Sequence, residues 1–282
     1  MILVFGKTGQ VARELAADET VTCLSRDQAD LTDPAACAEV IRAHAPAAVI
    51  NAAAYTVVDR AEAEEDLATL INGTTPGVMA ETCATLGIPF VTLSTDYVFD
   101  GKGSSPWHPD EPVAPLNAYG RSKQLGEAAV RLAGGTHVIL RTSWVVSAHG
   151  SNFVKTMLRL GQDRDRMRVV ADQIGAPTPA RAIAAACIEI ARQLVADPEK
   201  SGTYHFAGQP ETSWAGVATE IFTEAEIPCA VAEIPSSAYP TAAPRPLNSR
   251  LDCSTLERVF GITRPDWQAG LKDILKDLGE RA

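Results

Sequence analysis

The sequence predicts an α/β protein with a parallel, doubly wound sheet and a smaller, mixed α/β lobe in its C-terminal half. Short apolar runs alternate with longer segments of helical spacing through the first half of the chain. The first run, ILVF at 2–5, is apolar on both faces, as a parallel strand buried between two helical layers should be. Strand–helix alternation of this kind indicates a parallel sheet.

Five strands separated by helices are expected in the first half. Asp33 is placed to cap the second helix, Pro34 lies in its first turn, and Gly87 ends the third helix. The expected strands cover 2–5, 21–25, 47–54, 88–95 and 137–145. The expected helices cover 10–16, 33–45, about 66–86 and 118–133.

After about residue 150, helical segments alternate with short, Pro-rich extended pieces. We therefore expect residues 1–150 to form the main α/β domain, and residues 151–282 to form a lobe that partly returns to the sheet. No flexible linker separates the two parts, which predicts that they pack tightly. The expected helices of the second part cover 152–161, 180–196, 213–225, 254–260 and 267–279.

Composition and charge exclude several classes of partner. The chain has 282 residues and a formal charge of −10, so its overall field repels nucleic acids and anionic membrane surfaces. No apolar run is long enough to span a bilayer, and MILVFGKTGQ has no basic n-region or cleavage site. The six Cys are scattered without zinc spacing, as in a reduced, cytoplasmic protein.

The stretch FGKTGQVA at 5–12 takes the first strand directly into a Gly6-x-x-Gly9-x-x-Ala12 turn and a helix. A tight glycine turn at a helix N-terminus presents free backbone N–H groups to a phosphate. Its position at the first strand of a β–α–β run predicts dinucleotide binding on a Rossmann-like sheet. The spacing differs from GxGxxG, but Ala12 still permits close packing of helix on strand.

The end of the second strand, LSRDQADL, bears on the choice of cofactor. NAD sites usually have an acidic residue here, which binds the ribose 2′-hydroxyl. Arg26 is able to pair with a 2′-phosphate, which favours NADPH and leaves NADH open, because Asp27 is adjacent. A solvated loop charge is the alternative interpretation of Arg26. Asp30 is better placed to touch the adenine edge.

The third and fourth strands end in NAAAYT at 51–56 and LSTDYVFDG at 93–101. Three small residues at a strand's end let a flat cofactor lie close to the backbone, although tight packing alone would also explain them. The hydroxyls of Ser94 and Thr95 fall at the carboxyl end of the sheet, where ligands of open α/β folds bind. Capping of a turn is the alternative explanation for them.

Tyr119 and Lys123 are four residues apart on an expected helix, and therefore on one face of it. A phenol has a pKa of about 10, and a neighbouring ammonium is expected to lower it. A phenol tuned in this way donates a proton to a carbonyl oxygen, and Thr95 is able to supply a second hydrogen bond. Reduction of a carbonyl by these three residues also requires a hydride donor beside the same carbonyl.

These motifs, in this order, resemble the extended short-chain dehydrogenases/reductases. Blocks in the second half narrow the resemblance to the dTDP-4-dehydrorhamnose reductases, over nearly the whole chain. The resemblance implies reduction of dTDP-4-dehydro-β-L-rhamnose to dTDP-L-rhamnose by hydride transfer to C4 from NADPH or NADH, in nucleotide-sugar and cell-surface polysaccharide biosynthesis. The narrowing blocks are RTSWV (141–145), GSNFVKTML (150–158), VVADQIGAPT (169–178), HFAGQPETSW (205–214) and RPLNSRLD (245–252).

The resemblance also implies residue roles, with Tyr119 as proton donor, Lys123 as the partner that lowers its pKa, and Thr95 bonding the keto oxygen. The same Thr95, with Asp96, Trp144 and Asn248, would face the dTDP-sugar. The simpler interpretation of Asn248 is a turn residue, and the simpler interpretation of Trp144 is a core residue. The implied cofactor residues are Gly6, Thr8, Gly9, Gln10, Val11, Arg26, Asp30, Leu31, Ala53, Ala54, Tyr55, Thr56, Leu93, Tyr119 and Lys123.

Some members of this family bind Mg²⁺ through Glu residues and dimerise on it. No such set can be located in this sequence, so no metal ligand is assigned and a homodimer stays open. Three other enzymes of the same superfamily are alternatives: an epimerase, a 4,6-dehydratase and a talose-forming reductase. Dehydratases commonly have Asp-Glu after the Thr, whereas this chain has Asp96-Tyr97. The regulatory β-subunit of methionine adenosyltransferase, a similar protein that acts as a binding partner, gives the non-catalytic alternative.

Overall fold

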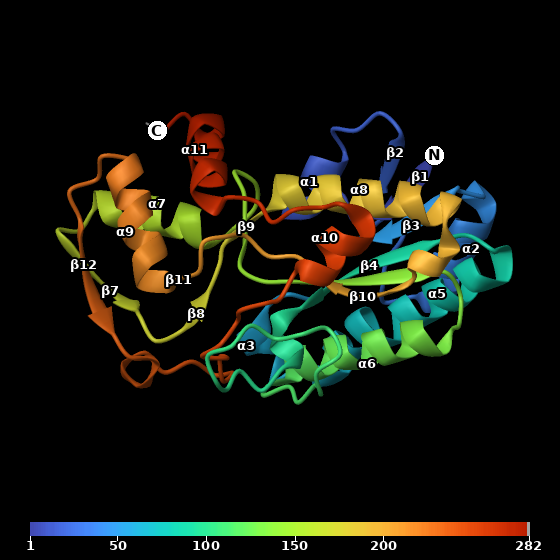
Figure 1. The fold of residues 1–282 in the computed structure, drawn as a ribbon, viewed down its shortest axis with the longest axis horizontal. Coiled ribbons are helices and arrows are strands. Elements are labelled where there is room, and N and C mark those ends of the chain that lie inside the picture. The colour runs from blue at the N-terminus through green and yellow to red at the C-terminus, as the bar shows by residue number, and fades with distance from the viewer. Residues whose placement is uncertain (281–282) are drawn as a thin grey trace.

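The computed structural model describes residues 1–280 and contains one central sheet of six parallel strands (Figure 1). The strand order is β10–β5–β4–β3–β1–β2, and every pairing in it is parallel. This confirms the predicted fold class. The strands are β1 (Ile2–Phe5), β2 (Val21–Leu24), β3 (Ala48–Asn51), β4 (Phe90–Thr95), β5 (His137–Thr142) and β10 (Gly202–His205).

Helices cover both faces of this sheet, because successive side chains of a strand point to opposite faces and those of β1 are all apolar. Ile2 and Val4 pack toward α1 and α8, whereas Leu3 and Phe5 pack toward α2 and α5. The helices of the first layer are α1 (Gln10–Leu15), α8 (Ala180–Ala196) and α10 (Ser254–Phe260). Those of the second are α2 (Pro34–His44), α5 (Thr75–Leu86) and α6 (Ala118–Leu132).

The order of the strands determines where a ligand can enter. From β1 the chain first adds β2 on one side and then β3 on the other, so the crossovers on either side of β1 diverge. In open parallel sheets, a divergence of this kind leaves a crevice at the carboxyl ends of the two strands. Here that crevice lies next to Gly6, which follows β1, and Ala52, which follows β3.

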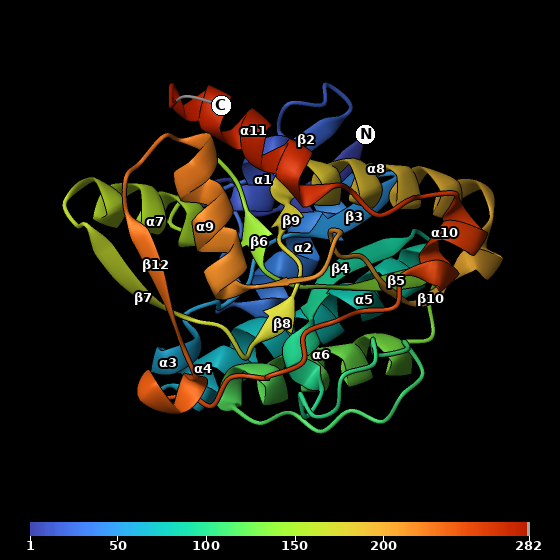
Figure 2. The same cartoon turned by 60° about the vertical axis from the view of Figure 1, so that its left-hand side comes forward.

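A smaller lobe lies beside the carboxyl ends of the strands and has its own apolar core, which includes Met157, Phe222 and Leu271 (Figures 1 and 2). Its helices are α7 (Phe153–Gln162), α9 (Trp214–Glu224) and α11 (Trp267–Leu278). Its strands pair as β7 (Arg166–Val170) with β12 (Ala230–Ile234), β8 (Ile174–Gly175) with β11 (Thr212–Ser213), and β6 (Val145–Val146) with β9 (Thr178–Pro179).

The second part of the chain also contributes α8, α10 and β10 to the main sheet and its covering layer. A domain boundary at residue 150 stays a prediction, and residues 281–282 of the expected lobe lie outside the described residues. No helix within residues 1–280 is long and apolar enough to cross a membrane.

Several expected element boundaries need correction. The strand expected over 137–145 stops at Thr142, because Trp144 has φ of 48° and cannot continue an extended strand. The helix expected over 66–86 is three pieces: α4 (Glu65–Thr69), a π-helical turn over Leu70–Thr74, and α5. The caps are confirmed, since Asp33 accepts a hydrogen bond from the Ala36 N–H and Gly87 has φ of 66°.

The short elements were not predicted, because two to five residues show no periodicity that a sequence can reveal. They comprise α3 (Val58–Ala61), the 3₁₀ turns Asp96–Val98, Pro198–Lys200 and Ser236–Ala238, and all the strands of the smaller lobe.

Candidate active site

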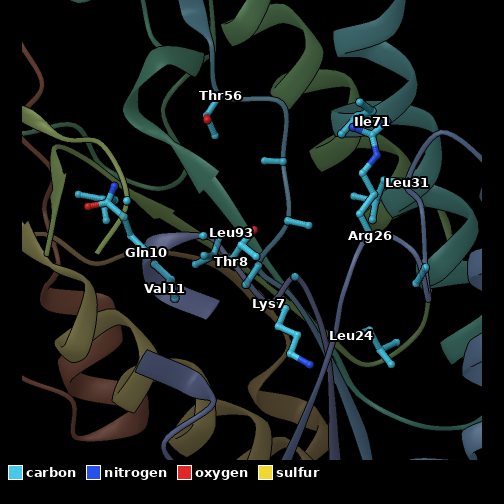
Figure 3. A pocket seen from close by; sticks show the side chains of 18 of the residues that line it. Lys7, Thr8, Gln10, Val11, Leu24, Arg26, Leu31, Thr56, Ile71 and Leu93 are labelled. Atoms are coloured by element: carbon cyan, nitrogen blue, oxygen red, sulfur yellow. The ribbon is translucent and has the colours of Figure 1, made fainter. Parts of the chain in front are cut away.

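A cavity of about 590 Å³ opens at the carboxyl ends of β1, β3 and β4 (Figure 3). Of the predicted cofactor residues, Tyr55 is the one outside its wall. The lining residues that were predicted are Gly6, Thr8, Gly9, Gln10, Val11, Arg26, Asp30, Leu31, Ala53, Ala54, Thr56, Leu93, Tyr119 and Lys123. The wall also includes residues that the sequence did not single out, among them Lys7, Ile71, Thr142, Gly150 and Ser151.

The glycine turn after β1 brings two strand ends together. Gly6 has φ of 113°, a conformation that L side chains rarely adopt. A Cβ atom at Gly6 would lie 3.3 Å from the Ala53 nitrogen, so the absence of a side chain permits the close approach of the β1 and β3 ends. The turn leads directly into α1, whose N-cap Gly9 has no side chain to occupy the first N–H groups of the helix.

One end of the cavity holds Arg26, Leu31 and Ile71, and Gln10 lies at the opposite end (Figure 3). The Arg26 Nε donates to the Asp30 Oδ2 at 3.0 Å. The pKa of Asp30 is lowered, chiefly by the backbone N–H of Thr32 and also by Arg26. The Arg26 side chain stays 75% exposed, so it is accessible to an anionic group entering this end.

Tyr119 and Lys123 lie on α6 and line the cavity beside Leu93, which confirms that they share a face. The helix is oriented by Asn117, whose side chain accepts from the Gly120 N–H. The Lys123 Nζ donates to the Leu93 carbonyl oxygen at 2.6 Å. Burial lowers the pKa of Lys123 to about 8, against the opposing influence of Glu127.

The expected effect of Lys123 on Tyr119 is wrong for this structure. Burial raises the pKa of Tyr119 to about 12, Asp96 adds to the rise, and a hydrogen bond with Thr95 opposes it. The ammonium of Lys123 is held by the Leu93 carbonyl. The phenol therefore keeps its proton at neutral pH, which is the state that a proton donor requires.

Thr95 and Asp96 stand next to Tyr119 but outside the cavity wall. The Thr95 hydroxyl donates to the Asp96 Oδ1 at 3.1 Å and accepts from the Tyr97 N–H. Asp96 is 2% exposed, and its Oδ2 has no hydrogen-bond partner among the described residues. Burial raises the pKa of Asp96 to about 6, although hydrogen bonds from Ser249 and Thr95 oppose the rise.

Asn248 and Tyr55 are occupied by the protein itself. The Asn248 side chain donates to the carbonyl oxygens of Lys102 and Ser105 and accepts from Arg250, so it fastens the loop that follows β4. This arrangement favours the simpler, structural interpretation of Asn248. The Tyr55 hydroxyl donates to Glu64 at 2.7 Å, away from the cavity.

Asn72 is a site-forming residue that the sequence did not reveal. It is 2% exposed and lies in the π-helical turn. Its side chain accepts from the Tyr55 N–H, donates to the Tyr55 carbonyl, and also donates to the Ser122 hydroxyl at 3.0 Å. Asn72 therefore joins the loop after β3 to α6, next to Lys123. No short motif signals a π-helical turn, so only the fold could show it.

A buried ion pair lies behind the cavity. Glu127 and Arg141 are each 2% exposed, and two nitrogens of Arg141 donate to the carboxylate at 2.6 and 2.8 Å. The Ser94 hydroxyl donates to the same carboxylate at 2.6 Å. Because Ser94 lines the cavity, the pair connects α6 and β5 to the end of β4. Among residues 1–280, no group of three or more His, Cys, Asp or Glu is arranged to hold a metal.

Known proteins match this chain over nearly its whole length. A dTDP-4-dehydrorhamnose reductase from Burkholderia thailandensis is 45% identical, with 98% of each chain covered. The crystal structure of such a reductase from Clostridium acetobutylicum superposes with a TM-score of 0.92 at 33% identity, covering 99% of each chain. One from Bacillus anthracis, in complex with NADP, superposes with a TM-score of 0.90 at 32% identity, covering 98% of each chain.

The resemblance seen in the sequence is therefore confirmed at the level of the family. The family model described as the RmlD substrate binding domain matches residues 1–280, which is nearly the entire chain. The chain belongs to the RmlD family, that of the dTDP-4-dehydrorhamnose reductases.

Proposed function

We propose that this protein reduces dTDP-4-dehydro-β-L-rhamnose to dTDP-L-rhamnose, with NADPH as the hydride donor. The observation that carries the proposal is the position of Tyr119 and Lys123, which line the same cavity as the glycine turn of β1. A group able to protonate a carbonyl oxygen thus lies within reach of a dinucleotide. Family membership supplies the sugar-nucleotide substrate.

The cavity residues fit a dinucleotide. The Gly6 turn, which a Cβ would crowd, leaves room for a pyrophosphate beside the start of α1. Arg26 and Leu31 would hold the adenosine end, and Leu93 would lie behind the nicotinamide. When bound, the cofactor supplies the hydride. The Arg26 guanidinium favours a 2′-phosphate and hence NADPH, while use of NADH stays a prediction.

In the proposed mechanism, Tyr119 holds a proton that passes to the oxygen at C4 as that carbon is reduced. A pKa of about 12 ensures that the phenol is protonated at neutral pH. The single Thr95 hydroxyl proton, which is donated to the Asp96 Oδ1 in this structure, would have to turn to the C4 oxygen when the substrate binds. Lys123, anchored on the Leu93 carbonyl, would hold the nicotinamide ribose from the same face of α6 as Tyr119.

Two alternatives from the superfamily are less favoured by the residues present. A 4,6-dehydratase would be expected to have Glu after Thr95-Asp96, and Tyr97 stands there. A talose-forming reductase would use the same groups, and only the product distinguishes it. A homodimer also stays a prediction, which light scattering of the purified protein would test.

The test is consumption of NADPH by the purified wild-type protein, supplied with dTDP-4-keto-6-deoxyglucose and a 3,5-epimerase. The proposal expects NADPH consumption that depends on the epimerase, with dTDP-L-rhamnose identified by NMR. A product with the talose configuration would correct the stereochemistry at C4. A lack of consumption of both NADPH and NADH would overturn the proposal and direct attention to a protein partner.

A further inference from the structure

The backbone of Trp144 adopts an unfavourable conformation. Its φ of 48° lies in the left-handed region, where a bulky side chain is a true outlier. The Trp144 carbonyl accepts a hydrogen bond from the Thr178 N–H at 3.0 Å, which fixes the peptide between β5 and β6. Strain of this kind persists only where surrounding groups impose it, and it is concentrated at functional sites.

Aromatic stacking accounts for part of that constraint. The rings of Trp144 and Trp214 are stacked with centroids 3.8 Å apart and planes 15° apart. Phe153 contacts Trp214 in turn, with ring centroids 4.6 Å apart. Trp214 begins α9, and Phe153 begins α7, so two helix starts of the smaller lobe hold the Trp144 ring.

The backbone of β8 closes on the edge of the same ring. A Cβ atom at Gly175 would lie 3.0 Å from the indole of Trp144, so a larger residue there would crowd the ring. The same Cβ would lie 3.0 Å from the side chain of Ser249. Ser249 is close enough to Asp96 to oppose the rise in its pKa, and Asp96 in turn accepts from Thr95. Gly175 thus lies between the Trp144 ring and Ser249, which neighbours Asp96.

Trp144 is also adjacent in sequence to the cavity wall, because Thr142 and Val145 both line it. Trp144 and Trp214 each remain half-buried, although they stack on one another. Trp214 contacts two aromatic rings and Trp144 contacts one. Trp144 does not itself line the cavity, so we assign to it a ligand group that extends beyond the cavity wall. A flat indole face of this kind suits the apolar face of a sugar ring or a nucleobase.

We propose that Trp214 is a positioning residue that holds Trp144 in its left-handed conformation against the dTDP-sugar. This inference rests on the proposed function, because the ligand is the substrate of the same site. Trp214 contributes affinity for the sugar nucleotide through Trp144 and takes no part in binding the dinucleotide or in the chemical step. Its loss should therefore raise KM for the sugar nucleotide and leave kcat nearly unchanged.

The test compares Trp214→Ala and Trp214→Phe with the wild type, varying the sugar nucleotide at saturating NADPH. We expect KM for the sugar nucleotide to rise about 10-fold in Trp214→Ala and about 2-fold in Trp214→Phe, which keeps a stacking ring. The dissociation constant for NADPH, measured by fluorescence without substrate, should stay within about 2-fold of the wild-type value in both. Phe222→Leu is the matched control, because Phe222 packs in the same lobe core as the Trp pair.

A second measurement keeps the inference testable if Trp214→Ala does not fold. The far-ultraviolet circular dichroism of the wild type should contain an exciton couplet from the stacked indoles, absent in Trp144→Phe. Adding dTDP-L-rhamnose should change the couplet, and adding NADPH should not.

Three results would overturn the inference. They are an unchanged KM for the sugar nucleotide in Trp214→Ala, an equal rise of that KM in Phe222→Leu, and a couplet that does not change when dTDP-L-rhamnose is added. A wild type without reductase activity would instead refute the proposed function.

Discussion

Around the cavity, the side proposed for the cofactor (the sheet side) and the side proposed for the substrate (the lobe side) are held in place by different kinds of contact. Gly6, Ala53 and Leu93 lie at or next to the ends of strands in one six-stranded sheet, and backbone hydrogen bonds fix their positions. On the substrate side, Trp144 and Trp214 flank two-residue strands and are held by ring stacking. The comparison suggests that substitutions on the sheet side affect the stability of the whole fold, whereas substitutions on the lobe side affect the binding of one ligand.

The largest effect on stability is expected from Glu127→Gln, on the sheet side. The substitution leaves the Arg141 charge buried without its counter-ion, which should lower the free energy of unfolding by about 4 kcal/mol. Denaturant unfolding measures this loss. The matched control is Glu65→Gln, which breaks the half-exposed pair with Arg121 and should cost less than about 1 kcal/mol. Equal losses in the two variants would show that the buried pair does not organise the sheet side.

Asp96, where the two sides meet, should give the next largest effect, which is a dependence of the folding stability on pH. Its pKa is raised from 3.8 to about 6 by burial, so the folded state binds its proton more tightly than the unfolded state. The resulting stabilisation, about 3 kcal/mol, is complete below pH 4 and is lost as the pH rises through about 6.

Unfolding of the wild type and of Asp96→Asn at pH 4 and pH 7 checks this prediction. Relative to the variant, the wild type should lose stability between the two pH values. A constant difference between the two proteins would mean that Asp96 titrates normally.

The smallest effect is expected from Arg26→Ala, at the proposed adenosine end of the cavity. Its guanidinium is largely exposed, so its attraction for a 2′-phosphate should be worth about 1 kcal/mol, or about a 5-fold weaker affinity for NADPH. Affinity for NADH should not change. Titration calorimetry with both cofactors measures this, and Arg42→Ala, which removes an exposed ion pair on α2, is the control. A similar loss for NADH would place Arg26 at the adenine.

The sheet side was largely predictable from the sequence, because buried parallel strands are continuous apolar runs and their ends are marked by glycine, small or hydroxyl residues. Tyr119 and Lys123 could be placed on one face by helical spacing alone. Asn72 could not, because its role depends on a π-helical turn that has no sequence pattern. The raised pKa of Tyr119 could not be predicted either, since it is caused chiefly by burial, which only the fold reveals.

The substrate side was less predictable. The lobe strands are two to five residues long, and the partners of Trp144 come from Gly175 and Trp214, which are distant in the sequence. The resemblance pointed to Trp144 without revealing its positive φ, which ends β5 early. Asn248 shows a different limit of the sequence argument. The family motif suggested that it contacts a ligand, whereas in the fold its amide fastens a loop.

The central claim is that Tyr119 gives its proton to the substrate oxygen, and Tyr119→Phe tests it most directly. Removal of the hydroxyl keeps the ring, its edge-on contact with Tyr97 and the helix cap. Single-turnover hydride transfer should slow by about 10³-fold, while the dissociation constants for NADPH and the sugar nucleotide stay within about 2-fold of the wild-type values. A variant that retains most of the wild-type rate would contradict the account, and so would one whose rate falls only because NADPH no longer binds.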